Sequence, residues 1–219
     1  MVRPSALVVC GHYGPGTGAS WGAPNISPRY DEWELNIDMV VELCTALRRH
    51  GWKAYPITYI GRGRSAVAQR AQLRYKVDAE SLLSPSCVVS CHFNSSTNSR
   101  ASGHEVLYYA DSTKGYKLAS DVRNELNFAF PNQNDRGVKA TAPYPGWKNL
   151  SANVRKYNRY IYILHHTKAP AILVEPAFLS SSQDRLIIDR KTYFPDCAEA
   201  IAKGVVKWYD FISRGGINA

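Results

Sequence analysis

The chain has 219 residues, of which 45% are hydrophobic and 21% charged, and it carries a formal net charge of +9 at pH 7. This length suits one domain with a full core, and the balanced composition excludes an extensively disordered chain. No apolar stretch approaches the roughly 20 residues that a membrane-spanning helix needs, so we expect no transmembrane segment. The positive charge favours polyanions, whether nucleic acid, membrane surface or acidic polymer, without choosing among them.

Short β-branched or aromatic runs bounded by Gly, Pro, Ser or Asn predict six strands. They cover residues 5–10, 53–59, 87–92, 104–110, 159–165 and 171–175. Helical patterns separate several of these strands, at 31–51, 65–83, 113–128 and 195–212. The first pattern is the clearest, because Leu35, Met39, Leu43 and Leu47 follow one another at intervals of four before Gly51.

Strands that alternate with helices predict a single α/β domain over residues 1–219. We expect a mixed, mainly parallel, twisted sheet of about six strands with helices on both faces. Residues 159–165 and 171–175 resemble a hairpin, which would supply an antiparallel step. The polar stretch 131–152 is interpreted as one long surface loop, and residues 213–219 as a short C-terminal tail. We expect no separate binding domain.

Two features bear on where the protein is made. The apolar run at the N-terminus spans about half a dozen residues, which favours a first strand over a secretory signal. The five cysteines, an odd number, lie mostly in apolar runs, where free cysteine behaves as a small hydrophobic residue. We therefore expect synthesis in the cytoplasm and reduced core thiols rather than a disulfide framework.

Polar side chains stand at the ends of three predicted strands. His12 follows "ALVVCG", His92 follows "CVVSC", and Glu175 closes "AILVE". In a mainly parallel sheet, functional sites gather outside the carboxyl ends of the strands. One such histidine would more often be a core or turn residue, but two histidines and a carboxylate together point to a metal site.

Two imidazoles need a third ligand to hold a catalytic zinc ion with one coordination position left open. The candidates are Glu32 and Glu34, at the start of the first predicted helix. Asp31 can cap that helix, and Glu34 then occupies the capping-box position, where its carboxylate has a structural role. Glu32 has no such role and is favoured as the ligand, with Glu34 as the alternative.

Glu175 needs a role of its own. It is followed by Pro176 and Ala177 and is expected to be partly shielded from water, which tends to raise the pKa of a carboxyl group. Such a group can move a proton beside a metal. The structural alternative is a salt-bridged glutamate at the end of a strand. His104 opens another strand and either lines the same cleft or lies on the surface.

Taken in order, the segments "VVCGHYGPGTGA", "DEWELN", "VVSCHFNSS", "GHEVLYY", "DRGVK" and "PAILVEPAFLSS" resemble the zinc-dependent N-acetylmuramoyl-L-alanine amidases of the type 3 group. The resemblance covers nearly the whole chain. It implies that His12, Glu32 and His92 bind Zn²⁺ and that Glu175 is the catalytic carboxylate. Asn36 lies four residues after Glu32, as the family pattern requires, which supports Glu32 over Glu34.

The reaction implied by this resemblance is hydrolysis of the amide between N-acetylmuramic acid and L-alanine in peptidoglycan. Arg136 and Lys139 of "DRGVK" are weaker candidates for contact with substrate, together with His104 and Asn94. Tyr13, Cys91 and Pro176 depart from the residues that are usual in the family. Because none of these changes removes a ligand, they bear on cleft shape and specificity more than on the chemistry.

A catalytic domain made in the cytoplasm resembles a phage endolysin, which reaches the cell wall after the membrane has been permeabilised. The positive charge is then expected to favour anionic wall or envelope polymers. Two alternatives stay open: a carboxypeptidase-like zinc hydrolase on a similar sheet, and a non-catalytic wall-binding protein. Nucleic acid is not an expected partner, because the basic residues are dispersed and no reading motif accompanies them.

Overall fold

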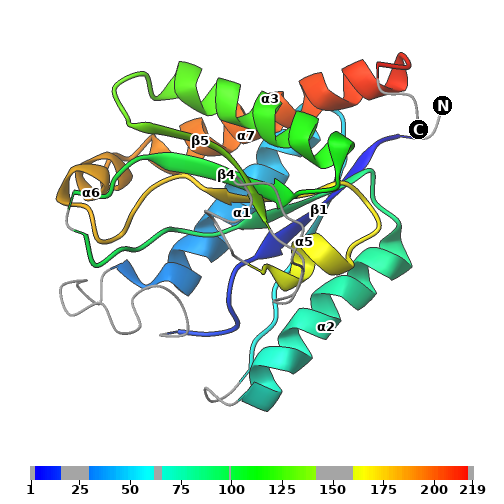
Figure 1. Ribbon diagram of the computed structural model, residues 1–219, viewed down its shortest axis with the longest axis horizontal. Coiled ribbons are helices and arrows are strands. Elements are labelled where there is room, and N and C mark those ends of the chain that lie inside the picture. The colour runs from blue at the N-terminus through cyan, green and yellow to red at the C-terminus, as the bar shows by residue number, and fades with distance from the viewer. Residues whose placement is uncertain (1–2, 16–29, 62–65, 99, 142–159, 217–219) are drawn as a thin grey trace.

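Six strands form one twisted sheet in the order β2-β1-β3-β6-β4-β5 (Figure 1). The computed structural model describes residues 3–15, 30–61, 66–98, 100–141 and 160–216. The strands are β1 (Ser5–Cys10), β2 (Lys53–Ile57), β3 (Cys87–Cys91), β4 (His104–Tyr109), β5 (Asp135–Thr141) and β6 (Ala171–Glu175). The helices are α1 (Glu32–Arg49), α2 (Ala66–Leu83), α3 (Thr113–Ala129), α5 (Tyr162–His166), α6 (Ser182–Ile188) and α7 (Tyr193–Ser213).

Helices cover both faces of the sheet, as the sequence predicts. Apolar side chains of α1, α3 and α7 pack on one face, where Leu43, Leu118 and Trp208 are fully buried. A smaller cluster on the other face contains Ile163 and Leu164 of α5, and α2 lies on this side, opposite α3 and α7 (Figure 1). The expected single α/β domain is confirmed.

The strands pair in parallel except at one place, where β4 runs antiparallel to β6. The predicted source of this step, a hairpin formed by 159–165 and 171–175, is wrong, because 162–166 form helix α5. Ile163 and Leu164 are adjacent in sequence and both buried, so the segment packs its apolar residues in a single short helix. Residue 159 lies outside the described residues.

The stretch 131–152 is also not one long loop. Residues Asp135–Thr141 form β5, an edge strand that pairs in parallel with β4. Residues 142–152 lie outside the described part of the chain. The other differences are small: α7 begins two residues before the predicted 195, and the short helix α6 had not been predicted.

A local signal explains where helix α1 begins. The Asp31 carboxylate accepts hydrogen bonds from the amides of Trp33 and Glu34, which confirms it as the N-cap of α1.

All five cysteines are free and buried, as expected. Among the described residues, every helix is too short or too polar to cross a bilayer.

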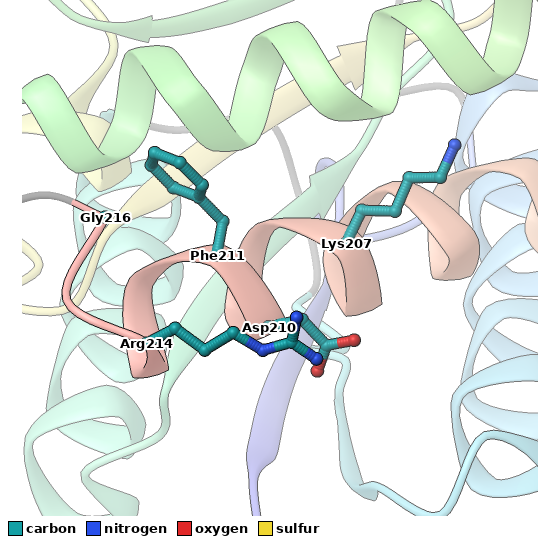
Figure 2. Close-up of a pocket in the computed structure, with 5 residues that line it drawn as sticks. All are labelled: Lys207, Asp210, Phe211, Arg214 and Gly216. Carbon is teal, nitrogen blue, oxygen red and sulfur yellow. The ribbon is translucent and has the colours of Figure 1, made fainter.

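The last turns of α7 border a hollow of about 440 Å³, called here the α7 hollow (Figure 2). Its lining residues are Lys207, Asp210, Phe211, Arg214 and Gly216, and all five are exposed. Phe211 is directed toward α3, where the ammonium of Lys117 lies 4.6 Å from the centre of its ring. This hollow therefore lies at the α3–α7 surface.

Candidate metal centre and active-site pocket

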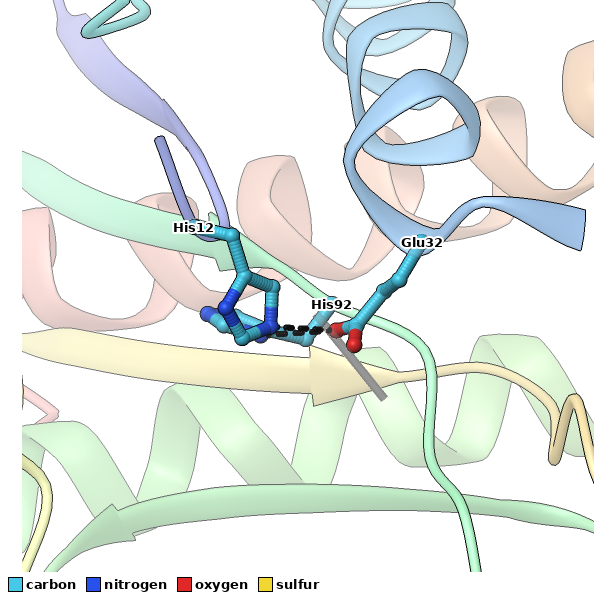
Figure 3. Close-up of side chains that lie close together, drawn as sticks. All are labelled: His12, Glu32 and His92. Atoms are coloured by element: carbon cyan, nitrogen blue, oxygen red, sulfur yellow. Dashed lines mark hydrogen bonds and ion pairs between the residues drawn. The ribbon is translucent and has the colours of Figure 1, made fainter. Parts of the chain in front are cut away.

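Three neighbouring parallel strands bring the predicted site residues to one edge of the sheet. Strands β1, β3 and β6 are adjacent, so their carboxyl ends meet. His12 lies two residues beyond β1, His92 directly follows β3, and Glu175 is the last residue of β6. Glu32 comes from the first turn of α1 and points toward the two histidines (Figure 3).

The side chains of His12, Glu32 and His92 form a candidate metal site. One potential ligand atom from each lies within 4.8 Å of the others. Glu32 Oε1 lies 2.9 Å from His12 Nε2 and 3.1 Å from His92 Nδ1, and the two imidazole rings meet edge to face with centroids 4.8 Å apart (Figure 3). Glu34, the alternative ligand, is exposed and takes no part in this cluster.

A tight turn after β1 makes this approach possible. A Cβ atom on Gly11 would lie only 2.6 Å from the Asn36 side-chain nitrogen and from the Cys91 carbonyl oxygen. Position 11 therefore requires glycine, because any larger residue would push β1 away from α1 and β3. The next residue, His12, has a φ angle of 59°, which turns its imidazole out of the strand.

The electrostatics of the cluster favour the protonation states that bind metals. Burial alone would raise the pKa of the Glu32 carboxyl, but the neighbouring His12 and His92 imidazoles outweigh burial and hold that pKa well below its ordinary value. Burial lowers the pKa of His92 to about 4. At neutral pH the site therefore presents a carboxylate and a neutral His92 imidazole, which are the forms that coordinate a cation.

This donor set fits zinc. Two imidazole nitrogens and one carboxylate oxygen match the three protein ligands of catalytic zinc sites, in which a further position is left for water or substrate. Oxygen-seeking cations such as calcium prefer sites made of oxygen ligands alone. The chemistry of the trio thus agrees with the zinc expected from the sequence.

Two members of the trio, His12 and His92, border a pocket of about 440 Å³, called here the active-site pocket. His12, His92 and Glu175 line it together, so the structure brings the predicted catalytic carboxylate beside two of the candidate ligands. Another part of its wall comes from α5 and the residues before it, including Tyr160 and Ile161.

Helix α2 supplies a polar wall that the sequence had not singled out. Gln72 and Lys76 line the active-site pocket although both are buried, and Glu80 is buried one turn further along the same helix. Polar residues at intervals of four usually mark the solvent face of a helix, which is why the pattern gave no signal here. The Lys76 ammonium donates a hydrogen bond to the His12 carbonyl oxygen at 2.9 Å.

The weaker substrate-binding candidates gather around a different carboxylate. Asn94, Arg136 and Lys139 all donate hydrogen bonds to Glu105. Burial alone would raise the pKa of the Glu105 carboxyl, but the cations of Lys139 and Arg136 outweigh burial and lower it. Glu105 lies opposite Glu175 across the β4–β6 pair, which puts this cluster next to the active-site pocket. Contact of Asn94, Arg136 and Lys139 with substrate stays a prediction.

His104 is placed differently from both sequence-based alternatives. Its side chain is fully buried and hydrogen-bonds to Asn127 and Gln133. It is neither exposed nor part of the active-site pocket that the described residues form. Its contacts are those of a satisfied core histidine, and a role in substrate binding stays untested.

A family model described as N-acetylmuramoyl-L-alanine amidase matches residues 7–207. Among curated proteins, a germination-specific N-acetylmuramoyl-L-alanine amidase of Bacillus subtilis is 24% identical over 212 residues, which are 91% of this chain and 77% of the relative. The B. subtilis amidase LytC is 25% identical over 180 residues, which are 81% of this chain but only 31% of LytC.

Solved structures show the same fold. An N-acetylmuramoyl-L-alanine amidase from Clostridium difficile 630 superposes with a TM-score of 0.72 at 22% identity, covering 95% of this chain and 97% of the other. The catalytic domain of an endolysin targeting Clostridia difficile gives a TM-score of 0.68 at 22% identity, covering 94% and 98% of the two chains.

Proposed function

The chain belongs to the N-acetylmuramoyl-L-alanine amidase family, and from this premise we propose that it is a zinc enzyme that cleaves the amide between N-acetylmuramic acid and L-alanine in peptidoglycan. The observation that carries the proposal is the cluster of His12, Glu32 and His92 at the edge of a pocket that Glu175 also lines. The pocket thus combines a metal-binding trio with a separate carboxylate.

His12, Glu32 and His92 would hold the metal, and Glu175, which lies outside this trio, moves protons. When bound, zinc polarises the scissile carbonyl and makes water more acidic. The three residues lie just after β1, in the first turn of α1 and just after β3. These three elements pack on one core, so the relative positions of the residues are fixed before substrate arrives.

Glu175 is the general base and then the general acid. It takes a proton from the attacking water and passes it to the nitrogen of L-alanine as the amide bond breaks. Its position at the end of buried strand β6, with only 7% of the residue exposed, restricts its contact with bulk water. This placement suits a group that must exchange protons with substrate rather than with solvent.

Digestion of purified peptidoglycan tests this function. The protein is incubated with sacculi, with and without a chelator, and with zinc added back, and the released products are identified by mass spectrometry. We expect intact stem peptides with a free L-alanine amine, lost with chelator and restored by zinc. Cleavage within the stem peptide would instead identify a peptidase, and binding without cleavage a wall-binding protein.

The biological role that we propose is that of an endolysin, made in the cytoplasm and acting on the wall after the membrane has been permeabilised. Two observations support it: the fold similarity to an endolysin catalytic domain, and the net charge of +9, which favours anionic wall polymers. Cytoplasmic expression in bacteria should leave culture turbidity unchanged until a membrane-permeabilising agent is added. Lysis without that agent, or wall cleavage without lysis after it, would contradict this role.

A further inference from the structure

The backbone of His12 has a conformation that needs support from its surroundings. Its φ angle of 59° lies in the left-handed region, which side chains other than glycine seldom adopt. Among the described non-glycine residues, only Ser84 also has a positive φ. Such a conformation persists when neighbouring contacts fix it, and it is often found at functional sites.

One hydrogen bond fixes the residue before His12, and another holds the carbonyl of His12 itself. The Gly11 amide donates to the Cys91 carbonyl of β3 at 2.9 Å, which anchors the residue before the turn. The carbonyl oxygen of His12 itself accepts a hydrogen bond from the ammonium of Lys76 at 2.9 Å. The contact from Lys76 therefore acts on the peptide unit that leaves the strained residue.

Lys76 occupies an unusual place for a lysine. It is only 3% exposed, and burial lowers its pKa to about 8. Burying an ammonium is unfavourable unless a partner compensates for the lost water. Lys76 also lines the active-site pocket with His12, His92 and Glu175.

Attachment of α2 to the domain has another source one turn away. Glu80 is also buried, and its carboxylate accepts hydrogen bonds from the amides of Lys168 and Ala169 at 3.1 and 2.9 Å. These bonds tie the end of α2 to the segment before β6. Lys76 instead reaches across to the turn after β1, beside the metal-binding trio.

We propose that Lys76 is a positioning residue for the metal centre. Its ammonium holds the His12 carbonyl, keeps the residue in its left-handed conformation, and so directs the imidazole toward Glu32 and His92. The inference rests on the metal-binding role proposed for this trio. It concerns ligand geometry and requires no contact between Lys76 and substrate.

The test compares zinc affinity with the stability of the metal-free protein. Lys76→Met removes the charge and the donor while keeping a long side chain, Lys76→Arg keeps both charge and donor, and Lys203→Met makes the same change at an exposed position of α7. Zinc affinity is measured at neutral pH by competition with a chromophoric chelator. The melting temperature of each metal-free variant is measured in parallel.

We expect Lys76→Met to weaken zinc binding about 10- to 100-fold, the usual effect of losing a group that orients a metal ligand. Lys76→Arg should recover most of that loss, and Lys203→Met should match the parent protein. Metal-free Lys76→Met should melt within a few degrees of the parent. If Lys76→Met does not fold, Lys76→Gln, which keeps a donor without the charge, should bind zinc with intermediate affinity.

Two results would overturn the inference. One is a zinc affinity in Lys76→Met, or in Lys76→Gln where Met prevents folding, within twofold of the parent protein. The other is a loss of zinc affinity that follows an equal loss of metal-free stability, which would make Lys76 a general structural residue. If the parent binds zinc and the Lys76 effect appears while peptidoglycan stays intact, the proposed amidase function fails and the positioning role stands.

Discussion

Two hollows of this molecule have the same volume, about 440 Å³, but the charged residues that line them differ in how far they are buried. The active-site pocket is bordered by buried or half-buried charged and titratable groups, among them His92, Lys76 and Glu175. Every residue that lines the α7 hollow is exposed, and the ammonium of its Lys207 reaches from solvent to the carboxylate of Glu125 on α3. Volume alone therefore does not locate function in this protein.

The two regions differ in the free-energy cost of removing their charged groups from water. Keeping Glu32 and Lys76 away from water is unfavourable, and the fold offsets that by pairing Glu32 with two imidazoles and Lys76 with a carbonyl. The charges of the α7 hollow keep their water, so they need no such arrangement. Changes in the first region should therefore affect activity strongly, and changes in the second hardly at all.

The largest effect is expected from Glu32→Gln. The amide keeps the size of the side chain but loses the charge that binds the metal and that faces the two imidazoles. Zinc affinity should fall by more than about 100-fold, beyond the loss usual for residues that only support a ligand. Amidase activity should fall to that of the chelated protein. Titration with a competing chelator measures the affinity, and unchanged zinc binding would exclude Glu32 as a ligand.

Glu175→Gln should separate chemistry from metal binding. Loss of a positioned proton carrier is expected to lower kcat by about 10²- to 10⁴-fold. Zinc affinity should stay within about twofold of the parent, because Glu175 is outside the metal-binding trio. The measurement is kcat on purified muropeptides at saturating zinc. Full activity in this variant would show that another group moves the proton.

Acid should destabilise the metal-free protein through the active-site pocket. The folded pKa of His92 is about 4, below the 6.5 of an unperturbed histidine, so the unfolded chain binds a proton first as pH falls. The stability linked to the neutral imidazole is present above pH 6.5 and is lost progressively toward pH 4, by up to roughly 3 kcal/mol.

Chemical denaturation of the metal-free protein at several pH values between 7 and 4.5 checks this dependence. Glu32, whose pKa is lowered, acts in the same direction at the acid end of the range. Burial also lowers the pKa of His165 to about 4, so part of the decline should remain when His92 is replaced. His92→Gln should nevertheless flatten the curve, and identical slopes in parent and variant would contradict the assignment.

The smallest effects are expected at the α7 hollow. Arg214→Ala and Asp210→Ala should each change the free energy of unfolding by less than about 1 kcal/mol, because exposed charges contribute little. Their kcat and KM should stay within about twofold of the parent values. Denaturant titration and muropeptide kinetics check both statements. A tenfold change in KM would mean that this hollow takes part in substrate binding.

Strand ends were the most informative part of the sequence. The runs before His12, His92 and Glu175 are almost entirely apolar because β1, β3 and β6 are central strands covered on both faces. Polar residues directly after such runs can be located without a structure. Their convergence follows from parallel pairing alone, and the structure places all three at one pocket.

Elements at the edge of the sheet were harder to predict. Strand β5 has the sequence DRGVKAT, in which the basic residues Arg136 and Lys139 both donate hydrogen bonds to Glu105 on the neighbouring strand. This pattern has no clear alternation of apolar and polar residues. Helix α5 has only five residues, and its aromatic and β-branched composition favours a strand, so tertiary packing decides its conformation.

Buried polar contacts gave no usable signal. Lys76 lies at the same helical face as Gln72 and Glu80, and the sequence alone indicates a solvent-facing stripe there. The structure reverses that interpretation, because this face of α2 covers the active-site pocket and the segment before β6. Long-range partners such as the His12 carbonyl, 64 positions away from Lys76, cannot be found from periodicity.

The most direct test of the account is the position of zinc in crystals of the zinc-loaded protein, located by anomalous scattering at the zinc absorption edge. We predict one strong peak about 2.0–2.2 Å from a nitrogen of His12, a nitrogen of His92 and an oxygen of Glu32, with Glu175 near but not bound to it. The α7 hollow should show no such peak. Density at another cluster, or a vacant trio in a protein that binds one equivalent of zinc, would contradict the central claim.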